Sequence, residues 1–163
     1  MFKKLFTSLV RPHLEYGNVV WSPIHMLENI QRRATKLIPG FKDISYEERL
    51  AKLDLPTLVY RRWRGAMIEV YKIMNNKYTI TPVSVGLIKD WGRTRGHQHK
   101  LYKRKHRLSI RKNAFGIRCV HEWNHLPDHV INSDSVNIFK NRLDKHWDNR
   151  KFNIGYNWNP TPI

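Results

Sequence analysis

PTLVYRRWRGAMIEVYKIM, residues 56–74, is the longest helical pattern in the sequence. Pro56 is typical of the first turn of a helix, where its missing N–H needs no partner. Apolar side chains recur every three or four positions and define one face: Val59, Trp63, Ala66, Met67, Val70, Ile73 and Met74. Arg61, Arg62 and Arg64 lie in the first two turns, where they oppose the positive end of the helix dipole unless an anion binds there.

Shorter helices are predicted before this segment. Residues 2–9 place apolar side chains on one stripe, and Pro12 is expected to interrupt that helix. A Ser-Pro pair at residues 22–23 is typical of a helix start, and the apolar face of this helix comprises Leu27, Ile30, Ala34, Leu37 and Ile38. Residues 45–48 have the S-x-x-E form of a capping box, which predicts a short helix to about residue 53.

Two further helices are predicted after it. Asn113 is expected to cap the first, and Pro127 to end it. Ser133 or Asp134 is expected to cap the second, whose apolar face comprises Val136, Phe139, Leu143 and Trp147. We assign the large aromatic side chains to the core rather than to base stacking: Trp21, Trp63, Phe115, Trp123, Phe139 and Trp147.

Together these elements predict a mostly α fold, an irregular helical domain of about six helices. The length allows one domain, which we place over residues 1–147. Within it, amino-terminal helices occupy 1–76, a basic, loop-rich connector follows over 77–112, and carboxy-terminal helices occupy 113–147. The Asn-rich segment 148–163 is expected to be a loose, flexible tail.

Composition and charge narrow the function classes. The chain has 163 residues, with 30 Lys and Arg against 13 Asp and Glu, a net charge of +17. Its 40% hydrophobic content argues against a disordered basic tail, and no apolar run reaches the ~18 residues of a membrane span. Cys119 is the single cysteine, which excludes an intrachain disulfide, and we assign it to the core.

These properties predict a cytoplasmic or nuclear protein with a polyanionic partner. Nucleic acid ranks before an anionic membrane, and no membrane partner is expected. The sequence contains no phosphate-binding glycine loop and no adjacent pair of aspartates for a two-metal site. We therefore expect no cofactor, no metal and no catalytic residue.

One segment concentrates the positive charge, because residues 91–121 contain no Asp or Glu. Basic side chains can neutralise phosphates, and an interleaved aromatic such as Tyr102 can stack on an unpaired base. We predict contacts to the nucleic-acid backbone from Arg93, Arg95, Lys100, Lys103, Arg104, Lys105 and Arg107. Smaller contributions are predicted from Arg32, Arg33, Arg61 and Arg62, if their two helices pack side by side. A solvated charged loop is the alternative.

Residues 121–125 match the zinc-protease pattern H-E-x-x-H. On a helix, His121 and His125 share a face and can bind zinc, with Glu122 as general base. Pro127 cuts this helix short, and the third ligand would have to come from Asp134, Asp144 or His146. The simpler interpretation is a set of exposed polar positions around a buried Trp123. A zinc-dependent hydrolase remains an alternative function.

Eight segments resemble, in order, a region that follows the polymerase domain of jockey-like non-LTR retrotransposon reverse transcriptases. Residues 9–16 and 20–23 resemble its L-x-R-P-x-L-E-Y … W-x-P segment. The other matches are I-Q-R-R at 30–33, S-Y-E-E-R-L at 45–50, R-R … Y-K-I at 61–73, T-R-G-H at 94–97, R-x-x-F-F … R … W-N-x-L-P at 111–127, and S-V-x-x-F-K-x-x-L-D at 135–144. The resemblance covers about residues 5–147.

The resemblance implies a fragment of an RNA-directed DNA polymerase, its thumb-side carboxy-terminal region. The polymerase palm of this family carries an A-D-D sequence, and this chain has no Asp-Asp pair, so no polymerase activity is expected. The implied role is to bind the nucleic-acid backbone and support template or target handling, with the rest of a reverse transcriptase as a second partner. His121 and Glu122 fall on variable positions of the family motif. A non-functional relic of a mobile element is a further alternative.

Overall fold

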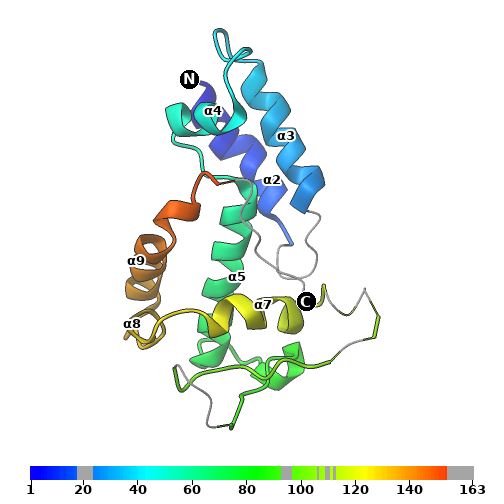
Figure 1. The fold of residues 1–163 in the computed structure, drawn as a ribbon, viewed down its shortest axis with the longest axis vertical. Helices are drawn as coiled ribbons and strands as arrows, with labels where there is room; N and C mark the ends of the chain where they lie inside the picture. The colour runs from blue at the N-terminus through cyan, green and yellow to red at the C-terminus, as the bar shows by residue number, and fades with distance from the viewer. Residues whose placement is uncertain (18–23, 93–96, 106, 109–110, 112, 154–163) are drawn as a thin grey trace.

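Helices dominate the computed structural model, which describes residues 1–17, 24–92, 97–105, 107–108, 111 and 113–153 (Figure 1). Over these ranges it has no strand beyond an isolated bridge, and none of the helices is both long enough and apolar enough to cross a bilayer. The mostly helical fold class is confirmed. The elements are α1 (Phe2–Leu5), the π-helix η1 (Phe6–Val10), α2 (Arg11–Glu15), α3 (Ile24–Lys36), α4 (Tyr46–Leu53), α5 (Leu58–Met74), the 3-10 helix η2 (Pro82–Val85), α7 (Phe115–Asn124), α8 (Asp128–Ile131), α9 (Val136–His146) and the 3-10 helix η3 (Asp148–Arg150).

Helix α5 runs along the middle of the molecule (Figure 1). Helices α1 to α4 lie around one end of it, and α7 crosses the other end. A larger hydrophobic cluster combines its predicted face with α7, α8, α9 and part of the connector. A smaller cluster lies at its amino-terminal end and contains Phe6, Leu14, Tyr46, Leu50, Leu55 and Leu58. Both clusters therefore depend on the same helix.

The aromatic side chains assigned to the core are buried wherever the structure describes them. This holds for Trp63, Phe115, Trp123, Phe139 and Trp147, whereas Trp21 lies outside the described residues. Cys119 is fully buried, and burial raises the pKa of its thiol to about 12. A thiol with so high a pKa remains protonated and behaves as a small core side chain.

A buried carboxylate joins α3, α4 and α5. Glu28 accepts hydrogen bonds from the Tyr46 hydroxyl at 2.6 Å and from the Val59 N–H at 3.1 Å. The Thr57 hydroxyl accepts from the Tyr60 N–H at 3.1 Å and completes the cap of α5. Burial is the main cause of a raised pKa at Glu28, against which the hydrogen bonds act. Its carboxylate lies at the positive end of the α5 dipole, where an acceptor is most stabilising.

The buried face of α3 agrees only in part with the predicted one: Leu27 and Ala34 are half-buried and pack against the smaller cluster. Glu28, Gln31 and Thr35 are buried, whereas Ile30 and Leu37 of the predicted apolar face are exposed. Gln31 donates to the Pro56 carbonyl at 3.1 Å, beside the Glu28 contacts. The polar residues of α3 supply hydrogen-bond partners to the start of α5, and these contacts determine which side of α3 faces inward.

The amino-terminal helical segment does not stop at Pro12. It runs through α1, η1 and α2, and Pro12 lies in the first turn of α2, where its missing N–H is tolerated. The wider π turn of η1 precedes it, with the Arg11 N–H bonded to the Phe6 carbonyl. Only Phe6 of the predicted stripe is fully buried, and Leu5 and Leu9 are exposed.

Helix boundaries follow the predictions more closely in the rest of the chain. The Ser45–Glu48 capping box of α4 is present in both directions. Ala114, not Asn113, precedes α7 and offers it no side-chain cap. Ser135 caps α9 through a 3.2 Å bond from the Ile138 N–H, in place of the predicted Ser133 or Asp134. The short elements η2 and α8 were not predicted.

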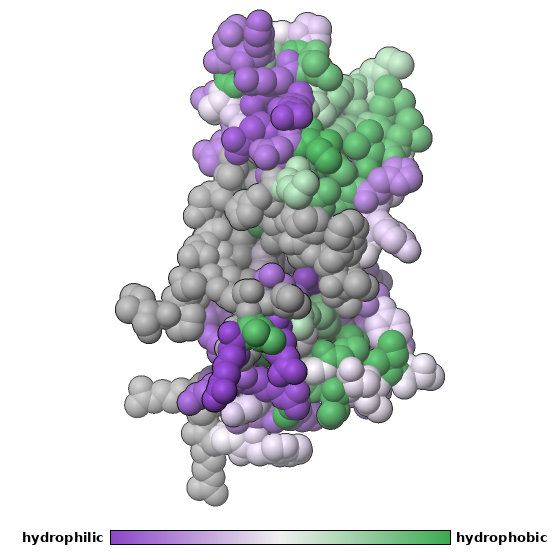
Figure 2. All heavy atoms as spheres, turned by 90° about the vertical axis from the view of Figure 1, so that its right-hand side faces the viewer, coloured by the Kyte–Doolittle hydropathy of each residue, from purple (hydrophilic) through white to green (hydrophobic). Residues whose placement is uncertain are grey.

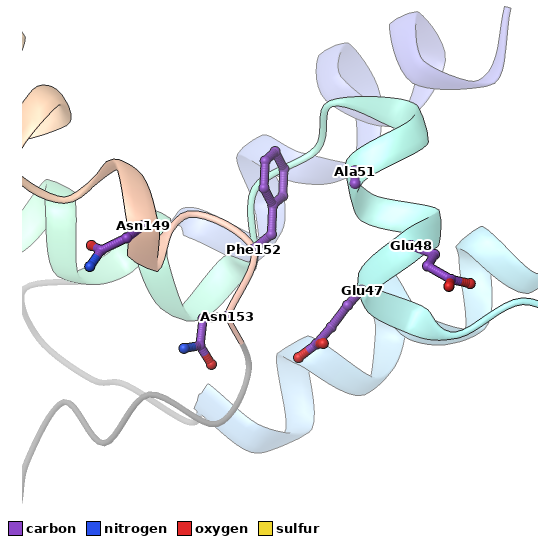
Figure 3. A pocket seen from close by; sticks show the side chains of 6 residues that line it. All are labelled: Glu47, Glu48, Ala51, Asn149, Phe152 and Asn153. Carbon is purple, nitrogen blue, oxygen red and sulfur yellow. The ribbon is translucent and has the colours of Figure 1, made fainter.

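The segment after α9 is docked rather than loose over residues 148–153. The Lys151 carbonyl accepts from the Thr57 N–H at 3.1 Å, and the Lys151 ammonium pairs with Asp54 at 2.9 Å. Phe152 packs against the smaller cluster. Figure 3 shows this segment opposite α4, across an open hollow of about 530 Å³. Of the predicted tail, residues 148–153 therefore contact the fold, and 154–163 lie outside the described ranges.

Replacement of the buried carboxylate provides a test of this junction. In Glu28→Ala, the Tyr46 hydroxyl and the Val59 N–H lose their acceptor, so we expect the free energy of unfolding to fall by about 2 kcal/mol or more. Urea denaturation followed by circular dichroism measures it. The matched control is Glu47→Ala on exposed α4 surface, where we expect little change. Equal destabilisation by both variants would contradict this role for Glu28.

Candidate nucleic-acid interface

Two consecutive residues at the end of α7 anchor the basic connector through its backbone. The Trp123 ring N–H donates to the His99 carbonyl at 2.7 Å, and the Trp123 carbonyl lies 3.1 Å from Nε2 of His97. The Asn124 side chain accepts from the Leu101 N–H and donates to the Leu101 carbonyl, both at 2.8 Å. Residues 97–101 are thereby held against the helix, with Leu101 in the core.

His97 serves this anchor in its neutral form. Its Nδ1 accepts from the His99 N–H at 3.2 Å, so Nε2 must carry the proton that is donated to the Trp123 carbonyl. Burial lowers the pKa of His97, because the charged imidazolium is poorly solvated inside the fold. His97 is therefore a structural residue of the connector.

A second backbone contact stiffens the connector. The Asp90 N–H donates to the Lys100 carbonyl at 2.9 Å, and the Tyr102 N–H donates to the Ile88 carbonyl at 2.7 Å. These bonds flank an antiparallel bridge between Lys89 and Leu101. Residues 88–90 and 100–102 form a short paired stretch beside α7 (Figure 1).

The predicted basic residues that the structure describes lie along the continuation of this stretch. Lys103, Arg104, Lys105 and Arg107 are exposed, and Lys100 is half-buried. Arg93 and Arg95 lie outside the described residues. This end of the molecule is opposite to the one that carries α3 and α4 (Figure 1). Figure 2 shows strongly hydrophilic atoms gathered in two groups, one towards each end of the face in view.

The arginines of α3 and α5 that were predicted to contact nucleic acid do not form one continuous surface with the basic residues of the connector. Arg61 pairs with Glu15 of α2, with Nη2 and Oε2 2.9 Å apart. Arg32 and Arg33 are exposed at the far end, where the Arg32 guanidinium lies 5.0 Å from the centre of the Tyr46 ring. These side chains belong to another part of the molecular surface.

The structure corrects the prediction for Arg62. Its side chain is buried, with 2% of the residue exposed, and it donates to the Leu14 carbonyl at 2.6 Å. Burial lowers the pKa of Arg62, and the charge of Arg118 adds to this effect. A guanidinium in this position holds α2 against α5 and cannot reach a nucleic acid on the surface.

Carboxylates lie near basic residues elsewhere in the fold. Asp144 pairs with Arg64 with Oδ2 2.7 Å from Nη2, Glu69 with Lys72 at 2.8 Å, and Asp54 with Lys3 and Lys151. In the parts of the chain that the structure describes, no carboxylate forms an ion pair with Lys103, Lys105, Arg107 or Arg111. The positive charge of the connector is therefore not neutralised by these carboxylates.

An exposed tryptophan in this region was missed at the sequence level. Trp91 is 87% exposed and follows the paired stretch, whereas Tyr102, named above, is 51% exposed. The exposure of Trp91 could have been predicted from its position, because Trp91 stands beside Gly92 at the start of the acid-free segment and outside any apolar pattern. Large exposed aromatics next to basic side chains are suited to stacking on unpaired bases.

The H-E-x-x-H residues form local contacts rather than a metal centre. Glu122 is buried, contrary to the prediction of exposed polar positions, and pairs with Arg150 at 3.0 Å. Nδ1 of His125 lies 2.7 Å from the His121 carbonyl, and Nδ1 of His121 lies 3.2 Å from Glu122. Among the described residues, no three His, Cys, Asp or Glu side chains are grouped to hold a metal ion.

Comparisons of the chain with protein-family models, curated proteins and solved structures gave no match.

The Asn124 anchor is open to a direct test. Asn124→Ala removes both partners of Leu101, so we expect the Leu101 amide to exchange with solvent about tenfold faster or more, since its hydrogen bond is lost. Native-state hydrogen exchange followed by NMR measures this rate. Asn137→Ala, on the exposed side of α9, is the control and should leave the rate unchanged. Unchanged protection of Leu101 in Asn124→Ala would refute the anchor.

Proposed function

We propose that this chain is a non-catalytic nucleic-acid-binding unit of the kind found in the carboxy-terminal region of non-LTR retrotransposon reverse transcriptases. It would hold template RNA or target DNA by the backbone, in the cytoplasm or nucleus, beside the rest of a reverse transcriptase. The main support is the acid-free segment 91–121, whose exposed basic side chains follow a stretch that the Trp123 and Asn124 side chains hold by hydrogen bonds to its backbone.

The contacts between motif segments add support for the resemblance. His97 of the T-R-G-H segment contacts Trp123 of the W-N-x-L-P segment. Glu15 of L-E-Y pairs with Arg61 of the R-R segment. Distant segments that share a family pattern are expected to meet where they carry a common structural role, and these segments do meet.

The proposed binding is sequence-tolerant. Lysine and arginine side chains contact phosphates, which position a strand without reading its bases. Trp91 and Tyr102 would stack on unpaired bases, which favours single-stranded nucleic acid. The chain would contribute affinity and orientation, and catalysis would reside in a polymerase domain.

The other functions receive less support. A zinc hydrolase would need Glu122 as a base facing substrate, but Glu122 is buried against Arg150. We do not propose that activity. A relic without function, whether stably folded or not, would bind nothing, which is the negative outcome of the experiments below.

Neutralisation of the connector tests the electrostatic contacts. We expect the native chain to bind single-stranded RNA with affinity that falls steeply as salt rises. In the triple variant Lys103→Gln, Arg104→Gln and Lys105→Gln, the slope of log K against log salt should shrink by about 2, because three phosphate contacts are removed. Fluorescence anisotropy with a labelled oligonucleotide measures both slopes.

A control variant with the same change in net charge distinguishes an effect of these three positions from an effect of total charge. The control triple variant Lys42→Gln, Lys52→Gln and Lys145→Gln removes three exposed charges outside the connector. It should keep a slope close to that of the native chain. The proposal fails if the two triple variants behave alike, or if the native chain shows no salt-dependent binding.

Stacking requires a separate variant. Trp91→Ala should weaken binding of single-stranded RNA about fivefold or more, since one stacked base contributes about 1–3 kcal/mol. The salt slope should stay unchanged, because no charge is altered. Tyr16→Ala, at an aromatic residue that is 80% exposed outside the connector, is the control and should bind normally. Equal affinities of Trp91→Ala and the native chain would remove Trp91 from the interface.

A further inference from the structure

A basic hollow lies between η2, the start of α7 and the end of the connector. Its volume is about 320 Å³. Arg104, Lys105 and Arg111 line it from the connector, and Gly86 and Gly116 line it with backbone. We infer that this hollow binds a phosphate group of a nucleic-acid strand. The inference rests on the proposed function and assigns one specific site to it.

The charge in the hollow favours an anion. Three basic side chains line it, and no Asp or Glu is among its lining residues. Lys105 and Arg111 form no ion pair within the described part of the chain. Lysine contacts phosphate as a point charge and arginine as a planar pair of donors, so both residue types suit this ligand. A phosphodiester carries one negative charge, fewer than the three cations around the hollow.

The backbone at the floor of the hollow is closely packed. Gly86 follows η2 with φ of +81°, and a Cβ added to it would lie 3.7 Å from the Cα of Gly116. A side chain on Gly116 would overlap the carbonyl groups of Val85 and Gly86. The backbone of η2 and that of α7 therefore pack directly against each other at the hollow, which only glycine at position 116 allows.

The first turn of α7 adds to the same electrostatic field. Ala114 precedes the helix and has no side-chain oxygen to accept from the N–H groups of that turn. Ala114 and Ile117 also line the hollow. The positive end of the helix dipole thus reinforces the three basic side chains. In contrast, the hollow of Figure 3 contains Glu47 and Glu48, so it does not suit an anion.

Inorganic phosphate is the first probe. We expect phosphate to shift the amide resonances of Gly86, Gly116 and Ile117 in the full chain, saturably, whereas chloride at the same ionic strength does not. In Lys105→Gln with Arg111→Gln, the Kd for phosphate should rise about tenfold or more, the loss of ~1.4 kcal/mol or more of charge-assisted binding. Lys42→Gln with Lys52→Gln is the matched control. Equal Kd values for the two double variants would overturn the site.

A second variant guards against loss of fold. Ala114→Asp supplies a cap for α7 and places a carboxylate beside the hollow, so the helix should be retained while phosphate binding is lost. Ala114→Asn supplies a neutral cap and should lose less affinity. Circular dichroism confirms that both variants are folded. Saturable phosphate binding by Ala114→Asp at the native affinity would also overturn the site.

RNA identifies the source of the phosphate and separates this inference from the proposed function. Oligonucleotides of one sequence with a 5′-phosphate or a 5′-hydroxyl distinguish a terminal phosphate from an internal one. Normal, salt-dependent RNA binding without a phosphate response would overturn the hollow alone. A phosphate response without salt-dependent RNA binding would overturn the proposed function and leave a site for free phosphate.

Discussion

Thirteen carboxylates accompany thirty lysine and arginine side chains in this chain, and several of those carboxylates connect elements of the fold by pairing with arginines of another segment. A guanidinium taken out of water without a partner costs several kcal/mol. Glu15 and Asp144 lie beside Arg61 and Arg64 on α5, and Arg150 has the buried Glu122. Each of these pairs joins residues distant in sequence, so the scarce negative charge also holds helices together.

Glu28 has a different use. Among the residues that the structure describes it forms no ion pair, and it accepts hydrogen bonds from the Tyr46 hydroxyl and the α5 backbone. Three arginines lie in the first two turns of α5, where the positive end of the helix dipole repels their charges. The Glu28 carboxylate lies at the same end of the helix and offsets this repulsion. Residues 91–121 contain no Asp or Glu, so their positive charge is balanced by solvent ions, by a partner or by carboxylates of other segments.

Local sequence patterns were sufficient where the stabilising contact is local. The capping box of α4 and the apolar face of α9 lie within a few residues and were predictable. The orientation of α3 was not, because Gln31 bonds to Pro56, which is 25 residues away. The same distinction between local and long-range information applies to the candidate interface. The acid-free segment is visible in the sequence, whereas the burial of Arg62 and the anchoring role of Asn124 depend on long-range contacts.

The two hydrophobic clusters along α5 differ in extent, and this has a consequence for how the molecule opens. Within the described residues, the cluster around α7 and α9 contains twenty buried hydrophobic side chains, against six in the cluster beside α2 and α4. Cooperative units with fewer buried contacts open at lower free energy. Thermal fluctuations should therefore release the first four helices while the anchored connector stays docked, so the end proposed to bind nucleic acid is also the more durable half.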